Sequence, residues 1–179
     1  LWTNKKLTVG AWINLISVSG DWFILNRNNH IQLMRFGGNL HFTLKFSDGV
    51  WRGVVKAWTP PTNVWMHVAG EWDGTTFNVY IDGALFATGT TTGDLYSLGK
   101  TGDIGIGASY DGTKMFLNGF ISQVLIYNRA LSDSEVQQLY NYPYDPPRNG
   151  LVLWLDWTSL DCANNKWWDK SGYNNHGTL

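Results

Sequence analysis

The 179-residue chain contains a single cysteine, Cys162, so no disulfide can form within it. Only 15% of the residues are charged, and the 13 basic side chains are scattered, with a formal net charge of −1. Nucleic-acid binding needs a basic stripe that replaces counterions, so this distribution argues against a nucleic-acid partner. No apolar run approaches the roughly 18 residues that span a bilayer, so we expect no membrane insertion. The first residues lack a charged-then-apolar signal pattern, and we expect any export signal to lie outside this sequence.

Apolar and polar residues alternate along most of the chain, which is the pattern of half-buried β-strands. Residues 40–46 have an apolar side chain at every even position, and residues 7–13 have one at every odd position. The segments 77–81 and 85–87 flank Asp82-Gly83, a strong signal for a hairpin turn. About ten such segments at regular spacing predict an all-β fold, a two-sheet antiparallel jelly-roll sandwich.

One short helix is predicted in the C-terminal region. Ser132 and Glu135 have the spacing of a capping box at a helix N-terminus. Apolar residues then share one helical face: Val136, Leu139 and Tyr140. The helix must end before Pro143, which opens a segment, 143–150, that holds three of the five prolines and is predicted to be a stiff, extended linker.

Several segments of residues 7–141 carry recognisable patterns in a fixed order. Residues 65–74 contain a Trp-Asp-Gly turn, 79–83 continue into the hairpin, and 104–107, 118–124 and 127–135 follow. In order and spacing these segments resemble the central hairpin, closing strands and terminal helix of laminin-G-like domains, which belong to the concanavalin A-like lectin and glucanase superfamily. The resemblance implies that residues 1–142 form a laminin-G-like body.

The last residues, 151–179, resemble the same family in an unexpected place. Residues 150–155 and 169–178 look like the opening of a laminin-G-like domain, which normally precedes the strand at 7–13. Either the parent protein carries tandem copies, or the chain is circularly permuted. An unpaired sheet edge and an uncovered apolar strand are both unfavourable, so we expect this tail to complete the sandwich, in cis or by exchange with another copy.

The sequence offers little for catalysis. Glucanases of the superfamily use acidic residues that alternate on one strand, and the nearest candidate is Glu71-Trp72-Asp73. Asp73 runs directly into Gly74 and a turn, and no third acidic residue continues the strand. The four histidines have no metal-ligand spacing, and Cys162 has no base partner in the sequence. We therefore expect that the chain is not an enzyme.

The resemblance also implies that the loop near the C-terminus can hold calcium. Hard cations take several oxygen ligands from carboxylates, amides and carbonyls on a flexible loop. The oxygen-bearing candidates are Asp169, Ser171, Asn174 and Asn175, with Asp111 in a rim loop as a second possibility. The alternative is that these residues form Asx-turns and bind no ion.

The resemblance implies that a sugar site would lie on the concave face or the rim loops, where the superfamily binds its ligands. Alternation along residues 51–58 places Arg52, Lys56 and Trp58 on one face, a mixed cationic and aromatic strip. Trp22 and Tyr110 lie near predicted loops, and aromatic rings can stack on the apolar face of a pyranose. The alternative is that the Trp residues belong to the core and the cations to a solvated surface.

The preferred function is recognition of a glycan or a cell-surface protein by a non-catalytic binding or adhesion module. Such a module would belong to an extracellular, cell-surface or virion protein. The alternative is a structural or assembly domain of a repeat-containing protein, with the tail mediating self-association. A degenerate glycoside hydrolase is a third possibility. A groove that collects aromatic residues would favour glycan binding, and an extensive dry contact between chains would favour assembly.

Overall fold

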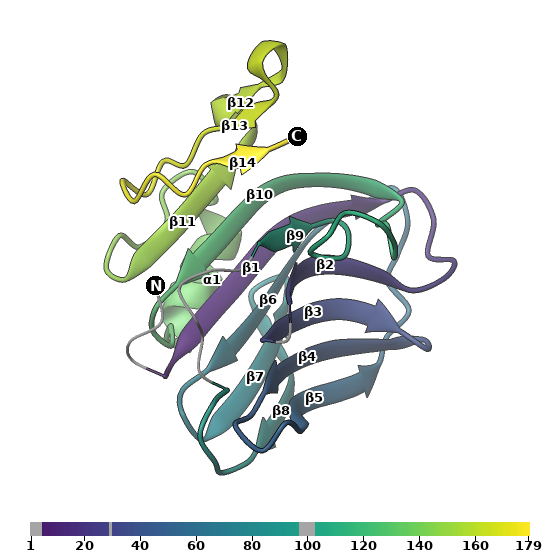
Figure 1. The fold of residues 1–179 in the computed structure, drawn as a ribbon, viewed down its shortest axis with the longest axis vertical. Coiled ribbons are helices and arrows are strands. Elements are labelled where there is room, and N and C mark those ends of the chain that lie inside the picture. The colour runs from purple at the N-terminus through teal and green to yellow at the C-terminus, as the bar shows by residue number, and fades with distance from the viewer. Residues whose placement is uncertain (1–4, 29, 97–102) are drawn as a thin grey trace.

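The computed structural model describes residues 5–28, 30–96 and 103–179. Two antiparallel sheets of six and five strands pack face to face, with one short helix on the outside of the larger sheet (Figure 1). This arrangement confirms the predicted all-β sandwich. The side chains that alternate inward from both sheets form its core, as the sequence pattern requires.

The larger sheet has the strand order β11-β10-β1-β6-β7-β8. Its strands are β1 (Leu7–Leu15), β6 (Trp65–Trp72), β7 (Thr76–Ile81), β8 (Ala84–Thr90), β10 (Gly119–Tyr127) and β11 (Leu151–Asp156). The smaller sheet has the order β5-β4-β3-β2-β9. Its strands are β2 (Trp22–Arg27), β3 (Ile31–Phe36), β4 (Asn39–Lys45), β5 (Trp51–Ala57) and β9 (Ile104–Ile106).

The turn at Asp82-Gly83 joins β7 to β8, as the sequence predicts. Both residues have positive φ, 51° and 76°, which matches the twist of the flanking strands. A close contact between the two sheets depends on another glycine, Gly70 on β6. A Cβ atom added there would lie 2.5 Å from the ring of Phe42, which is fully buried on β4. Gly70 therefore allows a large ring to fill the space between the sheets.

Helix α1 (Asp133–Asn141) begins with the predicted capping box. The Glu135 amide donates to Ser132 Oγ (3.3 Å), and the Ser132 amide donates to Glu135 Oε2 (3.0 Å). Val136 and Leu139 are buried against the outer face of the larger sheet, where they form a second apolar cluster that includes Tyr127 and Trp154. The helix ends before Pro143, as expected.

The segment 143–150 turns, whereas the sequence predicted an extended linker. The Asp145 amide donates to the Tyr142 carbonyl (3.0 Å), and the Leu151 amide donates to the Arg148 carbonyl (3.2 Å). These turns reverse the direction of the chain after α1, so that β11 lies at the edge of the larger sheet beside β10.

All six residues of β11 are buried, and the strand pairs antiparallel with β10 of the same chain. The indole of Trp154 lies between two cations, with Arg148 at 4.3 Å and Lys170 at 4.1 Å from the ring centroid. The buried Asp156 accepts a hydrogen bond from Lys170 Nζ (2.7 Å). The pairing with β10 and the burial of β11 thus hold the tail on the body, while the cation–π contacts and the ion pair connect Arg148 and Lys170 to β11 itself.

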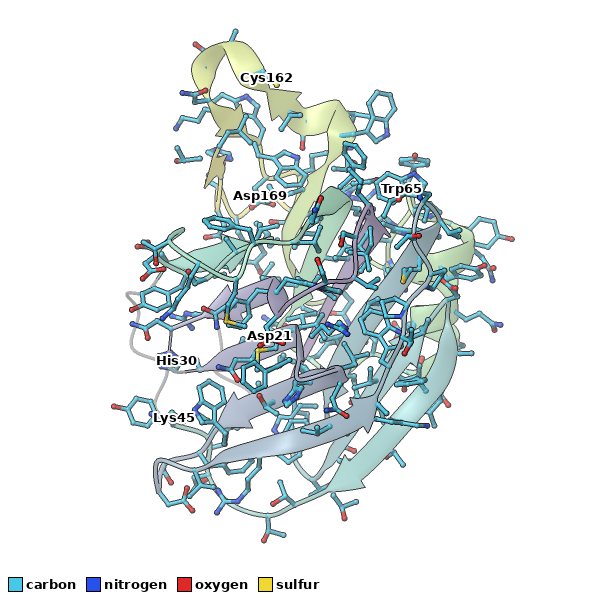
Figure 2. All side chains as sticks on the ribbon, turned by 90° about the vertical axis from the view of Figure 1, so that its right-hand side faces the viewer. Asp21, His30, Lys45, Trp65, Cys162 and Asp169 are labelled. Atoms are coloured by element: carbon cyan, nitrogen blue, oxygen red, sulfur yellow. The ribbon has the colours of Figure 1, made fainter. Side chains whose placement is uncertain are left out.

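The remaining tail forms a small three-stranded sheet that projects from the sandwich (Figure 1). Its strands are β12 (Leu160–Asp161), β13 (Lys166–Trp167) and β14 (Gly177–Thr178), with short 3-10 turns at Trp157–Ser159 and Cys162–Asn164. Figure 2 shows Cys162 far from the sandwich and Asp169 closer to it. Among the described residues, no helix is long and apolar enough to cross a membrane.

Candidate functional site

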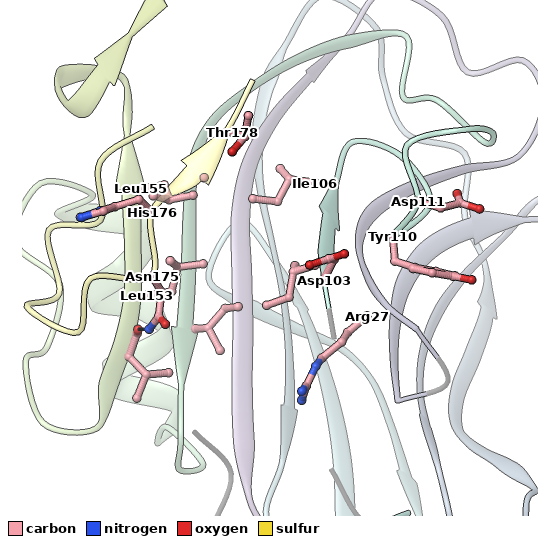
Figure 3. A pocket seen from close by; sticks show the side chains of 14 residues that line it. Arg27, Asp103, Ile106, Tyr110, Asp111, Leu153, Leu155, Asn175, His176 and Thr178 are labelled. Atoms are coloured by element: carbon pink, nitrogen blue, oxygen red, sulfur yellow. Dashed lines mark hydrogen bonds between the residues drawn. The ribbon is translucent and has the colours of Figure 1, made fainter. Parts of the chain in front are cut away.

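A groove of about 640 Å³ lies between the β9 edge of the smaller sheet and the end of the tail, residues 175–178, which lies beside β11 (Figure 3). The two sheets end differently here, because the larger one is extended by β11 while the smaller one stops at the three-residue β9. The groove follows from this difference in strand number.

The floor of the groove is aliphatic. It is formed by side chains from three strands: Ile104 and Ile106 of β9, Ile126 of β10, and Val152, Leu153 and Leu155 of β11. The β10 and β11 residues are at most 5% exposed, so they belong to the core and present only a small surface to the groove. An apolar floor of this kind can accept the CH face of a ligand without a polar group to be desolvated.

The wall on the body side carries polar groups on the ends of β2 and β9 and on the loop after β9. It consists of Arg27, Asp103, Tyr110 and Asp111. The loop is fixed by the Tyr110 amide, which donates to Asn26 Oδ1 (3.0 Å). Arg27 is only 4% exposed, and this burial lowers the pKa of its guanidinium.

The Asp111 carboxylate is oriented by its own loop. Its Oδ1 accepts hydrogen bonds from Ser109 Oγ (2.5 Å), Thr113 Oγ1 (2.8 Å) and the Thr113 amide (3.2 Å). These bonds lower the pKa of Asp111, so it is ionised at neutral pH. Asp111 therefore presents a negative charge at the rim.

The opposite wall is built by the tail, from Asn175, His176, Gly177 and Thr178. Asn175 Nδ2 donates to the Val152 carbonyl (2.8 Å), which leaves its amide oxygen as an acceptor. His176 Nδ1 accepts a hydrogen bond from the Asp169 amide (3.0 Å), so the neutral ring carries its hydrogen on Nε2. The two walls come from positions at least 64 residues apart, between Asp111 and Asn175.

The groove brings together three residues that the sequence proposed separately: Tyr110 as a ligand-binding residue, and Asp111 and Asn175 as metal ligands. The aromatic part of the prediction needs a correction. Trp22 and Trp58 are 1% and 7% exposed and pack edge to face in the core with ring centroids 6.0 Å apart, so neither offers a platform.

Arg52 and Lys56 do not join the groove either, because they lie on β5 at the other end of the smaller sheet. Arg52 forms an ion pair with Asp48 and lies over the ring of Phe46 (4.7 Å). Lys56 Nζ donates to the Phe86 carbonyl (2.8 Å), which bridges β5 and β8. Lys56 thus links the two sheets at their open side, whereas the contacts of Arg52 stay within the smaller sheet and the turn after β4.

The donors around Asp169 do not fit a calcium ion. Its Oδ1 accepts from the amides of Trp154 and Ser171 (2.9 Å each), and its Oδ2 accepts from Ser171 Oγ (2.7 Å) and the Asn175 amide (3.0 Å). Four donors occupy the lone pairs that a cation would need. Asn174 has a left-handed φ of 58°, as in a tight turn. The loop instead covers the free edge of β11, since the Lys170 amide also donates to the Trp154 carbonyl (2.8 Å).

Four groove residues had no sequence signal that singled them out: Arg27, Asp103, His176 and Thr178. Arg27 ends an apolar strand and Asp103 precedes another, which are common positions for charged residues. These four residues line one site only because β9 and the end of the tail lie close together in the folded chain.

The pair that was weighed for catalysis lies elsewhere. Glu71 is 3% exposed on the outer face of β6 and accepts a hydrogen bond from Asn78 Nδ2 (2.8 Å). Asp73 Oδ1 accepts from the amides of Thr75 and Thr76 (2.7 Å each), so it forms the predicted turn. Neither carboxylate lines the groove.

Solved structures share this fold at low sequence identity. A candidate carbohydrate-binding protein from Bacteroides ovatus matches with a TM-score of 0.78 and 20% identity over 98% of this chain and 52% of the other. The present chain thus spans about half the length of that protein, and the match includes most of the tail.

Two further structures match less closely. Domain 4 of an extracellular arabinanase from Geobacillus stearothermophilus, in complex with arabinotriose, has a TM-score of 0.60 and 21% identity over 78% of this chain and 68% of its own. The SAP-like pentraxin from Limulus polyphemus has a TM-score of 0.63 and 17% identity over 94% and 81%. At these identities the similarity shows the fold.

No curated protein matches the sequence. The model of one protein family, Laminin_G_3, matches residues 1–137, which is most of the chain. The chain therefore belongs to the Laminin_G_3 family of the concanavalin A-like lectin/glucanases superfamily.

Proposed function

We propose that the chain is a non-catalytic module that binds a carbohydrate in the groove between β9 and the tail. The observation that carries the proposal is the groove itself, in which an aliphatic floor is bordered by hydrogen-bond donors and acceptors. A sugar ring has the complementary character, with an apolar face and hydroxyl groups around its edge. Tyr110 on the rim is 38% exposed and adds an aromatic surface.

The absence of catalysis is part of the proposal. Glycoside hydrolysis needs a carboxylic acid with a raised pKa beside a second, ionised carboxylate. Hydrogen bonds lower the pKa of Asp111 in the groove, and Glu71, whose pKa is raised, lies outside it. The names of two structural neighbours, a candidate carbohydrate-binding protein and an arabinanase domain with bound arabinotriose, support a binding role. The extracellular arabinanase also supports an extracellular location.

A glycan array, probed with and without calcium, tests the proposal. We expect binding to at least one glycan in both conditions. Tyr110→Ala should weaken that binding about three- to tenfold, the usual contribution of one aromatic contact. Tyr173→Ala is the matched control, because Tyr173 is 59% exposed on the tail but does not line the groove. Failure to bind any glycan, or equal losses in both variants, would contradict the proposal.

A structural role in assembly is the second candidate, because the tail exposes several apolar side chains. Trp157, Leu160, Trp168 and Leu179 are 61%, 43%, 42% and 54% exposed. Sedimentation velocity across a range of concentrations distinguishes the two functions. Assembly predicts a dimer or larger species that Trp168→Ser reduces, whereas glycan binding needs only the monomer.

A further inference from the structure

The charges around the groove are not evenly distributed. Asp103 and Asp111 are both exposed and both line the groove on its body side. Asp111 is held in place by Ser109 and Thr113, so its charge has a fixed position. The mouth of the groove therefore carries two carboxylates.

Among the described residues that line the groove, Arg27 is the only lysine or arginine, and it is 4% exposed. Its charge lies deep, while the two carboxylates lie in solvent. On the tail side, Asn175, Gly177 and Thr178 are uncharged, and His176 uses Nδ1 as an acceptor. The potential at the mouth is consequently negative, and it acts on the charge of any ligand before contact.

We infer, on the basis of the proposed function, that this groove selects sugars by charge, binding amino sugars more tightly than neutral sugars and neutral sugars more tightly than uronic or sialic acids. The carboxylates also explain how a neutral ring is held, since each can accept hydrogen bonds from neighbouring hydroxyl groups. A unit charge about 6 Å from one carboxylate in water changes the affinity by about threefold. Two carboxylates therefore change the affinity about tenfold between an amino sugar and a neutral sugar, and about tenfold again between a neutral sugar and an acidic one.

The test uses three-member series of sugars that share a ring configuration and differ in charge. Each series contains the hexose, the hexosamine with an amine in place of the C2 hydroxyl, and the hexuronic acid with a carboxylate in place of the C6 hydroxymethyl group, in gluco, galacto and manno configuration. Each is titrated into the ¹⁵N-labelled chain at low salt, and the amide shifts of residues 104–111 and 175–178 are followed by NMR. We expect the amine to bind about tenfold more tightly than the neutral sugar and the acid about tenfold more weakly. In 1 M salt, where the screening length is about 3 Å, the differences should shrink to less than about threefold.

Asp103→Asn and Asp111→Asn identify the groups responsible. Asparagine keeps a side-chain oxygen, so Asp111→Asn can still accept from Ser109 and Thr113. Each variant should reduce the ratio of the affinities for the amino sugar and the uronic acid about tenfold. The reason is that each loses one carboxylate, which contributes about threefold to the amine–neutral ratio and about threefold to the neutral–acid ratio. Asp145→Asn is the control, since Asp145 is exposed near α1, outside the groove, and its removal changes the net charge equally.

The outcomes separate this inference from the proposed function. If no sugar shifts the groove amides, the groove is not a carbohydrate site and both fail. If the uronic acid binds as tightly as the neutral sugar or more tightly, charge selection is refuted while carbohydrate binding stands. An affinity ratio that Asp145→Asn reduces as much as Asp111→Asn would also refute it, because net charge alone would then be responsible.

Discussion

Replacement of Glu71 by glutamine should stabilise the protein, and by an amount that depends on pH. Glu71 is 3% exposed, and burial is the main cause that raises its pKa from 4.5 to about 7, with the nearby carboxylates of Asp73 and Asp133 acting in the same direction. In the unfolded chain the carboxyl group ionises near 4.5. Between these two values the folded state binds a proton that the unfolded state has released, so stability falls as pH rises from 4.5 to 7.

The magnitude follows from the two pKa values. At about 1.4 kcal/mol per pH unit, the ionised Glu71 lowers the free energy of unfolding by up to about 3 kcal/mol above pH 7. Glutamine is neutral at every pH and keeps an oxygen for Asn78 Nδ2. We expect Glu71→Gln to raise the free energy of unfolding by about 2–3 kcal/mol at pH 8 and to change it little at pH 4.5. Chemical denaturation followed by tryptophan fluorescence at several pH values measures this.

The same substitution at Glu135 is a control with the opposite sign. Arg129 pairs with Glu135 and, with the capping bonds of Ser132, lowers its pKa to about 2. This stability is present above pH 4.5 and is lost as pH falls through 2, so Glu135→Gln should lower the free energy of unfolding at neutral pH by about 1–2 kcal/mol, because the pair is partly screened by solvent. The reasoning is refuted if Glu71→Gln is no more stable than the wild type at pH 8, or if its gain is the same at all pH values.

Three further changes test other parts of the structure. His67 is fully buried, its ring nitrogens have no hydrogen-bond partner in the described part of the chain, and burial lowers its pKa from 6.5 to about 4. Because only the unfolded chain takes up the proton between these values, the contribution of His67 falls by about 3 kcal/mol from pH 6.5 to 4, opposite in sign to that of Glu71. Denaturation of His67→Leu and the wild type at both pH values should show the variant gaining about 3 kcal/mol relative to the wild type between pH 6.5 and 4. Asp169→Asn loses acceptors for Ser171 Oγ and the Asn175 amide and should cost about 1–3 kcal/mol. In thermal melts the wild-type midpoint should be the same in calcium and in chelator, and a calcium-dependent rise would contradict the assignment of this loop as a cover for β11. Gly70→Ala places a methyl group against the buried Phe42 ring and should cost about 1–3 kcal/mol, which a lowered thermal midpoint would reveal; an unchanged midpoint would show that the sheets can separate locally.

Local patterns in the sequence predicted the elements that depend on local interactions. Alternation located β1, β4, β7 and β8, and the Asp82-Gly83 turn and the capping box of α1 have the expected geometry. The error in the proposed site has a physical cause. Alternation divides a strand into two faces but does not say which face is inside. The buried side chains of β5 and of the residue after it, Val54 and Trp58, lie on the same face. Trp58 was therefore assigned to a surface strip when it belongs to the core.

Periodicity, turn chemistry and the cost of exposing apolar side chains are properties of the sequence, and they were enough to predict the fold class, the helix near residue 133 and the need of the apolar strand 151–155 for cover. The site required the tertiary structure, since Arg27, Asp111 and Asn175 meet only after β11 has docked beside β10. The tertiary structure also decided what Asp169 does. A carboxylate in a turn-rich loop can hold either a cation or backbone amides, and the free edge of β11 supplies the amide of Trp154 at 2.9 Å.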